Sequence, residues 1–306
     1  MSGTTRGSND DPTSSPTSSE KALDRGATGA TDVEIRDVWA DNLDEEMVNV
    51  RRLAEKYRYI SMDTEFPGVV ARPLERMEAS AYYYENVRIN VDLLKIIQLG
   101  ITFTDEEGRP VEGCCCFQFN FEFNVNEDMQ APESIDLLRR SGIQFDKHRE
   151  KGINLHRFGE VLISSGLVLS DDVTWVSFHG GYDFGYLLKV LTCLPLPRTS
   201  AKFFSTLRLY FPSFVDVKHL TARVSQGDSA PELGKLGLSK LGDALQLPRI
   251  GSMHTAGSDS LLTAFVYFKL KELHFGEKPA SGGVTRDILG PLYHNILHGL
   301  NDRGIK

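Results

Sequence analysis

Two acidic residues, Asp63 and Glu65, lie two positions apart at the end of the apolar run 59–62. Side chains two apart in a strand share one face, so this pattern brings both carboxylates together where a buried strand leaves the core. Like charges at that distance repel and raise each other's pKa, and keeping both ionised requires a cation between them. The pair therefore predicts a metal site.

Three further residues could join that site. Asp183 follows a predicted strand-to-helix junction at 178–183, and His254 stands five residues before Asp259 at the start of another predicted helix. Loops at strand ends are where α/β sheets usually hold ligands. Taken singly, an aspartate at a helix start is usually a cap, and a lone histidine is usually structural. Taken together, they predict one site with four carboxylates and a histidine.

The tripeptide Asp183-Phe184-Gly185 has a competing interpretation, because Asp-Phe-Gly is the magnesium-binding signature of protein kinases. The chain has no Gly-x-Gly-x-x-Gly loop, no strand lysine in a Val-Ala-Ile-Lys context and no His-Arg-Asp catalytic loop. The residues after Gly185 continue a helical pattern, so we do not favour a kinase.

The bulk composition is that of an ordinary globular protein. The chain has 306 residues, of which 41% are hydrophobic and 25% charged, and its length suits one large domain or two small ones. No apolar stretch approaches the roughly 20 residues of a membrane span, and residues 1–11 lack the features of a signal peptide. We therefore expect a soluble, intracellular protein with no membrane partner.

The net charge of −8 argues against broad electrostatic attraction to nucleic acid. It does not exclude a nuclease, because bound divalent cations can supply positive charge locally and catalytic carboxylates themselves make a chain acidic.

The four cysteines give no spaced framework for disulfides or zinc, since three are contiguous at 114–116 and Cys193 lies far away. We interpret the triplet as small residues within a strand, with redox or metal binding as the alternatives. The absence of a disulfide framework is what we expect of a protein in a reducing compartment.

The chain divides into three predicted regions. Residues 1–33 are rich in Ser, Thr, Gly, Asp and Pro, and they lack the apolar side chains that would offset ordering entropy, so we expect a disordered tail. A single domain is expected at 34–275, with order beginning near Val38 and Trp39. A partly ordered C-terminal extension is expected at 276–306.

Within the domain, strands that follow one another directly give way to strands that alternate with helices. We therefore predict an α/β fold with a mixed sheet, an antiparallel meander followed by parallel strands, flanked by helices. The predicted strands are 59–65, 95–104, 113–124, 174–178 and 214–218, with an irregular stretch through Pro67, Gly68 and Pro73 and a turn at 105–110. The predicted helices are 43–57, 156–165, 182–191 and 258–273, with others from Glu133 onward and two after the last strand.

Two longer motifs surround the acidic residues: MDTEFPGVV at 62–70 and FHGGYDFGYL at 178–187. With these motifs the chain resembles the Pop/Caf-type catalytic deadenylases of the CCR-NOT complex, which belong to the DEDD exonuclease superfamily. The resemblance extends roughly over 38–273. Both motifs are longer than general nuclease chemistry requires, which makes the resemblance specific.

The resemblance implies a ribonuclease H-like fold and a metal-dependent 3′-to-5′ poly(A) exoribonuclease, an mRNA deadenylase that releases 5′-AMP. It implies two divalent cations, Mg²⁺ or Mn²⁺, because hard carboxylate oxygens suit these ions and a pair of them can stabilise phosphodiester hydrolysis. His254 would take the proton of the attacking water. The residues that fall on the family's catalytic and metal-binding positions are Asp63, Glu65, Asp183 and Asp259, and His254 falls on its catalytic histidine.

For substrate binding we hypothesise that Phe66 and His179 lie beside the terminal nucleotides, because RNA is usually held by stacking and through its 2′-hydroxyl. The structural alternatives are a core residue for Phe66 and a hydrogen-bonding residue at a helix start for His179.

The partners implied by the resemblance are the poly(A) tail of mRNA, the NOT scaffold subunit and a second deadenylase linked through leucine-rich repeats. The expected location is the cytoplasm, with the nucleus as a second one. Two alternatives stay open: an adaptor that bridges the scaffold and the second nuclease, and the same site used as an endonuclease or on DNA.

Overall fold

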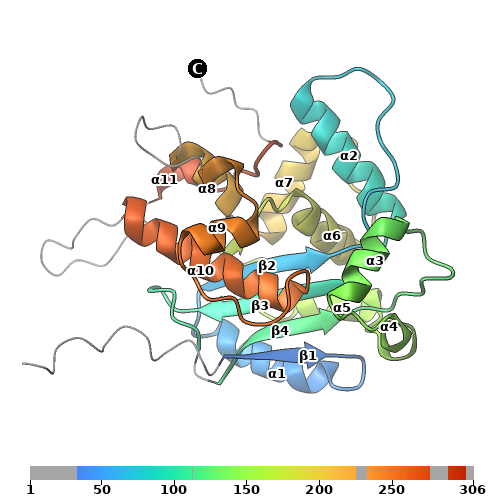
Figure 1. Ribbon diagram of the computed structural model, residues 1–306, viewed down its shortest axis with the longest axis horizontal. Coiled ribbons are helices and arrows are strands. Elements are labelled where there is room, and N and C mark those ends of the chain that lie inside the picture. Colours follow the sequence, from blue (N-terminus) through green and yellow to red (C-terminus); the bar gives the residue numbers. More distant parts are fainter. Residues whose placement is uncertain (1–32, 112, 225–232, 276–288, 301–306) are drawn as a thin grey trace, which may run out of the picture. The chain divides into compact units, whose positions relative to one another are not determined.

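The computed structural model describes residues 33–111, 113–224, 233–275 and 289–300, which include a six-stranded mixed sheet with helices on both faces (Figure 1). The strands are β1 (Glu34–Val38), β2 (Tyr59–Glu65), β3 (Gln98–Thr104), β4 (Cys114–Asn120), β5 (Thr174–Ser177) and β6 (Ser213–Asp216). The helices are α1 (Leu43–Ala54), α2 (Ala79–Leu93), α3 (Pro132–Arg140), α4 (Phe145–Lys151), α5 (Leu155–Ile163), α6 (Gly181–Thr192), α7 (Ser200–Tyr210), α8 (Val217–Val224), α9 (Leu238–Ala244), α10 (Ala256–Phe275) and α11 (Gly290–Tyr293), with a 3-10 turn at Leu233–Lys235.

The strand order across the sheet is β1-β4-β3-β2-β5-β6. β2, β3 and β4 pair antiparallel in sequence order, whereas β5 pairs parallel with β2 and β6 pairs parallel with β5. The predicted meander followed by parallel strands is therefore confirmed, and with it the ribonuclease H-like arrangement that the resemblance implied. β2 lies in the interior of the sheet, so the strand that carries Asp63 and Glu65 is held from both sides.

The two faces of β2 pack against different helices. Ile60 and Met62 are fully buried in the larger core cluster, which contains side chains of α1, α5 and α6. Ser61 faces the opposite way and donates through Oγ to the backbone carbonyl of Ser260 in α10 at 2.8 Å. Because side chains alternate along a strand, Asp63 and Glu65 lie on the face covered by α10.

Gly100 allows α10 to approach the sheet. It lies on β3 directly opposite Asp63, and a Cβ atom at this position would stand 1.9 Å from the backbone oxygen of Ala256. No other residue type fits that gap without a backbone shift. The first turn of α10, which carries Asp259, is therefore brought close to the strand that carries Asp63.

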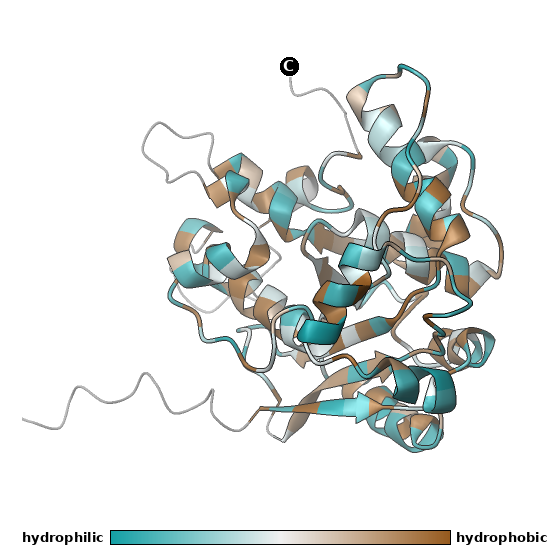
Figure 2. Cartoon of the chain, turned by 45° about the vertical axis from the view of Figure 1, so that its right-hand side comes forward, coloured by the Kyte–Doolittle hydropathy of each residue, from teal (hydrophilic) through white to brown (hydrophobic). Residues whose placement is uncertain are grey.

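Hydropathy follows this layering: the central strands are mostly apolar, and the surrounding helices carry hydrophilic faces (Figure 2). The largest fully buried side chains are aromatic and include Trp175 in β5 and Phe119 in β4. Among the described residues, no helix combines the length and the apolar character needed to cross a membrane.

The connection from α2 into β3 is fixed by Lys189 of α6. Its ammonium group donates to the backbone carbonyls of Val91, Asp92 and Leu94 at 2.7, 3.1 and 3.2 Å, which satisfies acceptors at the end of α2. Just beyond, the backbone N–H of Ile97 donates to the carbonyl of Glu65 at 2.8 Å. The end of β2 is thereby held in place by its neighbour.

Several elements differ from the prediction. A first strand, β1, begins at Glu34, before Val38, where order was expected to begin, and it pairs parallel with β4 at the sheet edge. Its sequence EIRDV is mostly charged, as suits an exposed edge, and this hid the strand. α2 and α7 were not predicted. α2 contains several Tyr, Asn and Val residues, which have modest helix propensity, and tertiary packing decides its conformation.

The C-terminal segment 289–300 packs against the domain. Leu297 and Leu300 are buried in the larger core cluster, and Asn295 forms three hydrogen bonds with the chain around β6. The rest of the predicted extension, 276–288 and 301–306, and nearly all of the predicted tail, 1–32, lie outside the described residues. The predicted domain boundaries stay a prediction.

Candidate active site

The carboxylates predicted from the sequence come from three elements that meet at one end of β2. Asp63 and Glu65 end that strand, Asp183 is the third residue of α6, and Asp259 is the fourth residue of α10. Asp63, Glu65 and Asp259 line a pocket of about 580 Å³, and Asp183 contacts Thr64, another lining residue. The residues that line this pocket are Asp63, Thr64, Glu65, Phe178, Lys235, Leu236, Gly237, Leu238, Ser239, Lys240, His254 and Asp259.

Both oxygens of Asp259 have partners within the chain. Oδ2 accepts from the backbone N–H of His254 at 3.1 Å, and Oδ1 accepts from Nη1 of Arg249. His254 has a φ of +61°, in the left-handed region that non-glycine residues seldom adopt. Strain of this kind tends to be retained where function requires it. The turn before α10 thus fixes the histidine and the aspartate relative to each other.

Asp183 is oriented by Thr64. The threonine lies between Asp63 and Glu65 on β2, so its side chain faces α6 rather than α10, and its Oγ1 donates to Oδ1 of Asp183 at 2.5 Å. Both residues are buried. The strand therefore supplies two carboxylates on one face and the hydrogen-bond donor for a third on the other.

Burial and mutual repulsion raise the pKa of these carboxylates. Burial first, and then the charges of Asp259 and Asp183, raise the pKa of Glu65 to about 8. Burial also raises the pKa of Asp183 to about 7, against the hydrogen bond from Thr64, which favours ionisation. The pKa of Asp63 lies well above its ordinary value, again through burial first and then through the charge of Asp183. Such groups become ionised together only when positive charge is nearby.

The donor set fits hard divalent cations. One ligand atom from each of Glu65, His254 and Asp259 can be chosen so that all three lie within 4.8 Å of one another. Among the residues that the structure describes, this is the one group of three or more such side chains close enough to hold a metal ion. Carboxylate oxygens are the ligands that Mg²⁺ and Mn²⁺ prefer. The residues of the pocket thus fit the predicted cations.

The two residues predicted to bind substrate lie beside the carboxylates but are not among those that line the pocket. Phe66 stacks on Tyr182 with a centroid distance of 4.8 Å and an interplanar angle of 18°. His179 is exposed, has a φ of +62° and lies against Tyr83, whose hydroxyl is 3.0 Å from Nε2 of the imidazole. Their role in binding substrate stays a hypothesis.

Four residues of the site were not identified from the sequence: Thr64, Arg249, Lys235 and Lys240. Thr64 stands inside the acidic motif, and alternation along the strand would have pointed it at α6. The two lysines line the pocket together with the carboxylates, and Lys240 is exposed. Arg249 and the lysines are separated from the motifs by turns, and nothing in their local sequence marks them.

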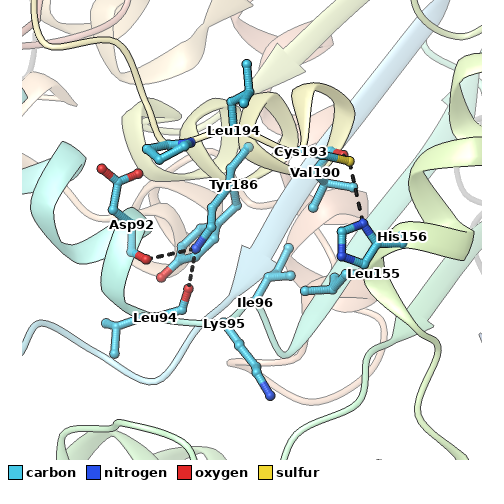
Figure 3. Close-up of a pocket in the computed structure, with 12 residues that line it drawn as sticks. Asp92, Leu94, Lys95, Ile96, Leu155, His156, Tyr186, Val190, Cys193 and Leu194 are labelled. Atoms are coloured by element: carbon cyan, nitrogen blue, oxygen red, sulfur yellow. Dashed lines mark hydrogen bonds between the residues drawn. The ribbon is translucent and has the colours of Figure 1, made fainter.

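A second pocket, of about 230 Å³, has a different character (Figure 3). Its walls are mostly apolar, and at one side Sγ of Cys193 lies 3.5 Å from Nδ1 of His156. The other three cysteines are free, and they lie in β4, as predicted for small strand residues. This pocket offers no group of carboxylates.

Comparisons with known proteins agree with this geometry. The family model described as CAF1 family ribonuclease matches residues 38–160. The chain is 48% identical over 260 residues to poly(A) ribonuclease pop2 of Schizosaccharomyces pombe, an alignment that covers 85% of this chain and 74% of that protein.

Two solved structures of CAF1-type proteins are also similar to this chain. The Mg²⁺- and Mn²⁺-bound form of S. pombe Pop2p superposes with a TM-score of 0.79 at 47% identity, over 87% of this chain and 99% of the other. The CAF1 chain co-crystallised with the yeast NOT1 MIF4G domain gives a TM-score of 0.67 at 35% identity, over 78% and 89% of the two chains.

Proposed function

The chain belongs to the CAF1 family of ribonucleases, and from this membership and the carboxylate pocket we propose that it is a metal-dependent 3′-to-5′ poly(A) exoribonuclease that releases 5′-AMP. The observation that carries the proposal is the convergence of Asp63 and Glu65, Asp183 and Asp259 from three elements, with His254 fixed beside Asp259. A relative that is 48% identical is named a poly(A) ribonuclease.

The chemistry follows from the side chains present. Hydrolysis of a phosphodiester adds negative charge at phosphorus and at the departing 3′-oxygen of the ribose, and bound Mg²⁺ or Mn²⁺ would activate water and stabilise that charge. Asp63, Glu65, Asp183 and Asp259 would hold the cations. His254 accepts the proton of the attacking water, as a histidine side chain can do in general-base catalysis.

The RNA substrate is negatively charged and must bind at an acidic pocket. Two groups of described residues could make favourable contacts with it. Lys235 and Lys240 line the same pocket as the carboxylates and can contact phosphate oxygens. Phe66, which stacks on Tyr182, and His179, which stacks on Tyr83, are the second group, and bases or sugars of the RNA would be held there by stacking.

The direct test is the product pattern on labelled oligo(A) with Mg²⁺, with Mn²⁺ and with a chelator. We expect a ladder of shortened products with either metal, no products with the chelator, and no ladder from Asp63→Ala. Asp171→Ala changes an exposed aspartate outside the pocket and serves as the matched control. Absence of a ladder from the parent protein, with Asp63→Ala indistinguishable from it, would remove the proposal.

Substrate class is decided by comparing oligo(A), mixed-sequence RNA and DNA of equal length. Metal and carboxylates alone do not select among them, so the selectivity must come from contacts to base and ribose. Equal turnover of the three would leave a general nuclease with the same chemistry and remove the assignment to poly(A).

For partners, we propose that the chain docks on a NOT scaffold, because a CAF1 chain of the same fold is co-crystallised with the NOT1 MIF4G domain. Association with a second deadenylase that carries leucine-rich repeats, and a location in the cytoplasm and nucleus, are proposed from family membership alone. A purely bridging role is tested in cells: mRNA decay rescued as fully by the Asp63→Ala, Asp259→Ala double variant as by the parent would favour the adaptor over the enzyme.

A further inference from the structure

Three rings from distant parts of the chain meet beside the start of α6. Tyr83 of α2 stacks on His179, with centroids 5.5 Å apart and an interplanar angle of 27°. His298 of the C-terminal segment meets His179 edge to face at 5.3 Å. His179 is exposed, and the other two rings are partly exposed. We refer to Tyr83, His179 and His298 as the ring cluster.

A buried carboxylate, Asp216 at the end of β6, positions two of the three residues. Its Oδ1 accepts from the backbone N–H of His179 at 2.8 Å and from that of Lys218 at 2.9 Å. Its Oδ2 accepts from the backbone N–H of His298 at 2.9 Å. Asp216 is fully buried, so the loop before α6 and the C-terminal segment are joined through one inaccessible group. His179 is held in left-handed backbone geometry by the same contact.

The ring cluster lies next to the catalytic carboxylates. A Cβ atom at Gly181, two residues before Asp183, would stand 3.1 Å from the hydroxyl of Tyr83 and 3.2 Å from Cδ1 of Leu300. At the next residue of α6, Tyr182 stacks on Phe66, which directly follows Glu65. Two groups of stacked rings therefore each include a residue shortly before Asp183: Tyr182, which stacks on Phe66 next to the metal-binding strand, and His179 of the ring cluster, which reaches the C-terminal segment.

The rings of the cluster retain hydrogen-bonding capacity. Within the described residues, neither ring nitrogen of His298 forms a hydrogen bond, and Nε2 of His179 contacts only the hydroxyl of Tyr83. Partial desolvation by neighbouring groups lowers the pKa of both histidines and favours the neutral rings, each of which offers one donor and one acceptor. Neutral planar groups of this kind suit the faces and edges of bases and the hydroxyls of ribose better than they suit phosphate.

We infer that the ring cluster is an upstream base-binding surface, on which an adenine of the single-stranded RNA stacks next to the nucleotide that is being removed. The inference rests on the proposed function, and it assigns to the C-terminal segment a part of the substrate-binding surface. Every base has a face that can stack on such rings. The contact therefore binds the RNA strand without recognising the hydrogen-bonding edge of the base.

The decisive variant is His298→Ala. The anchor to Asp216 uses the backbone N–H of His298 rather than its ring, and Leu297 and Leu300 stay in the core, so the segment keeps its position in the variant. We expect KM for oligo(A) to rise about tenfold, equivalent to about 1.4 kcal/mol, with kcat changed by less than about twofold. His298→Phe keeps a stacking face and restores a KM close to that of the parent. His274→Ala, an exposed histidine in α10, is the matched control.

Affinity for oligo(A) in the presence of Ca²⁺ and the product ladder with Mg²⁺ are measured on the same full-length variants. Weaker binding by His298→Ala, restored by His298→Phe and absent from His274→Ala, supports the inference. Unchanged affinity and KM in His298→Ala, or a His298→Phe variant as weak as His298→Ala, overturns it. A parent that binds oligo(A) but gives no ladder removes the proposed function, while the binding comparison still decides the inference.

Discussion

Arg249 donates through Nη1 to Oδ1 of Asp259, the carboxylate whose other oxygen accepts from the backbone N–H of His254 at 3.1 Å. The same guanidinium donates to Oγ of Ser258 at 3.1 Å and, through Nη2, to Oγ of Ser239 at 2.9 Å. Arg249 therefore joins α9, which lines the pocket with Ser239 and Lys240, to the helix that carries Asp259. It acts as a positioning residue for both walls of the site.

Arg249→Gln should lower kcat by about tenfold or more, because small displacements of catalytic groups have effects of that size. Arg249→Lys should retain only part of the activity, since an ammonium group cannot bridge Ser239 and Asp259 with the planar geometry of a guanidinium. Arg140→Gln, an exposed arginine on α3, is the control. Turnover on oligo(A) at saturating Mg²⁺ measures the effect, and full activity of Arg249→Gln would exclude a positioning role.

Thr64→Val removes the hydroxyl that donates to Asp183 while keeping the shape of the side chain in the strand. We expect a loss of activity of about tenfold, because Asp183 is left buried without its oriented donor. Thr64→Ser, which keeps the hydroxyl, should recover most of the activity. A Thr64→Val variant with the kinetics of the parent would show that Asp183 is held adequately by other contacts.

Metal-free stability should fall as pH rises. The pKa of Glu65 is raised to about 8 and that of Asp183 to about 7, so in the folded state both groups stay protonated above the pH at which they ionise in the unfolded chain. The contribution of the two protonated groups to the free energy of unfolding is fully present below their unfolded pKa values, near 4. It is lost as pH rises through their folded pKa values, about 7 to 8.

The measurement is the thermal midpoint in chelator from about pH 6 to about pH 9, repeated with Mg²⁺ or Mn²⁺. We expect a decline with pH in chelator and a much smaller decline with metal, because the cation binds the ionised carboxylates. Glu65→Gln cannot ionise at this position, and the decline should be weaker in that variant. A midpoint that rises with pH in chelator would contradict the assignment of raised pKa values.

The positions of the acidic residues could be predicted because they follow local strand and helix patterns. Alternation along 59–65 placed Asp63 and Glu65 on one face, and the helix starts placed Asp183 and Asp259 at the ends of their elements, as the structure shows. Local periodicity also gave the mixed sheet. These are properties of residues within a few positions of one another, which is the range over which a sequence pattern operates.

The features that the sequence did not predict depend on contacts between residues that are far apart in the chain. Thr64 and Asp183 are 119 positions apart, and the anchor of His298 on Asp216 spans 82 positions. Neither contact leaves a local signature. α2 was missed for a related reason: its aromatic and β-branched residues favour other conformations locally, and packing of Tyr84, Val87 and Val91 against the core stabilises the helix.

Lys240 should bind substrate phosphate rather than take part in the chemistry. It is exposed at the rim of an acidic pocket, where a polyanionic strand needs neutralisation. Lys240→Gln is expected to raise KM severalfold at low salt with little change in kcat. The slope of log affinity for oligo(A) against log salt should become shallower by about 0.7, the value for one contact to a single strand. Lys202→Gln on α7 is the control, and an unchanged slope would exclude the contact.

His254 can serve in either of two ways, because its ring lies close enough to Glu65 and Asp259 to join a metal site and is also placed to accept a proton. We predict that proton transfer is its role, so His254→Ala should lower kcat by about a hundredfold or more while metal binding is largely retained.

Two measurements separate these roles for His254. The first is the Mn²⁺ concentration that half-maximally raises the thermal midpoint, which should be nearly the same in His254→Ala and the parent and much higher in Asp63→Ala. The second is kcat at saturating Mn²⁺, which should stay low in His254→Ala although the metal site is filled. His254→Gln, which keeps hydrogen-bonding capacity without a titrating group, should behave like His254→Ala in both. A loss of Mn²⁺ affinity in His254→Ala equal to that in Asp63→Ala would make the histidine a metal ligand and would leave activation of the water to the carboxylates.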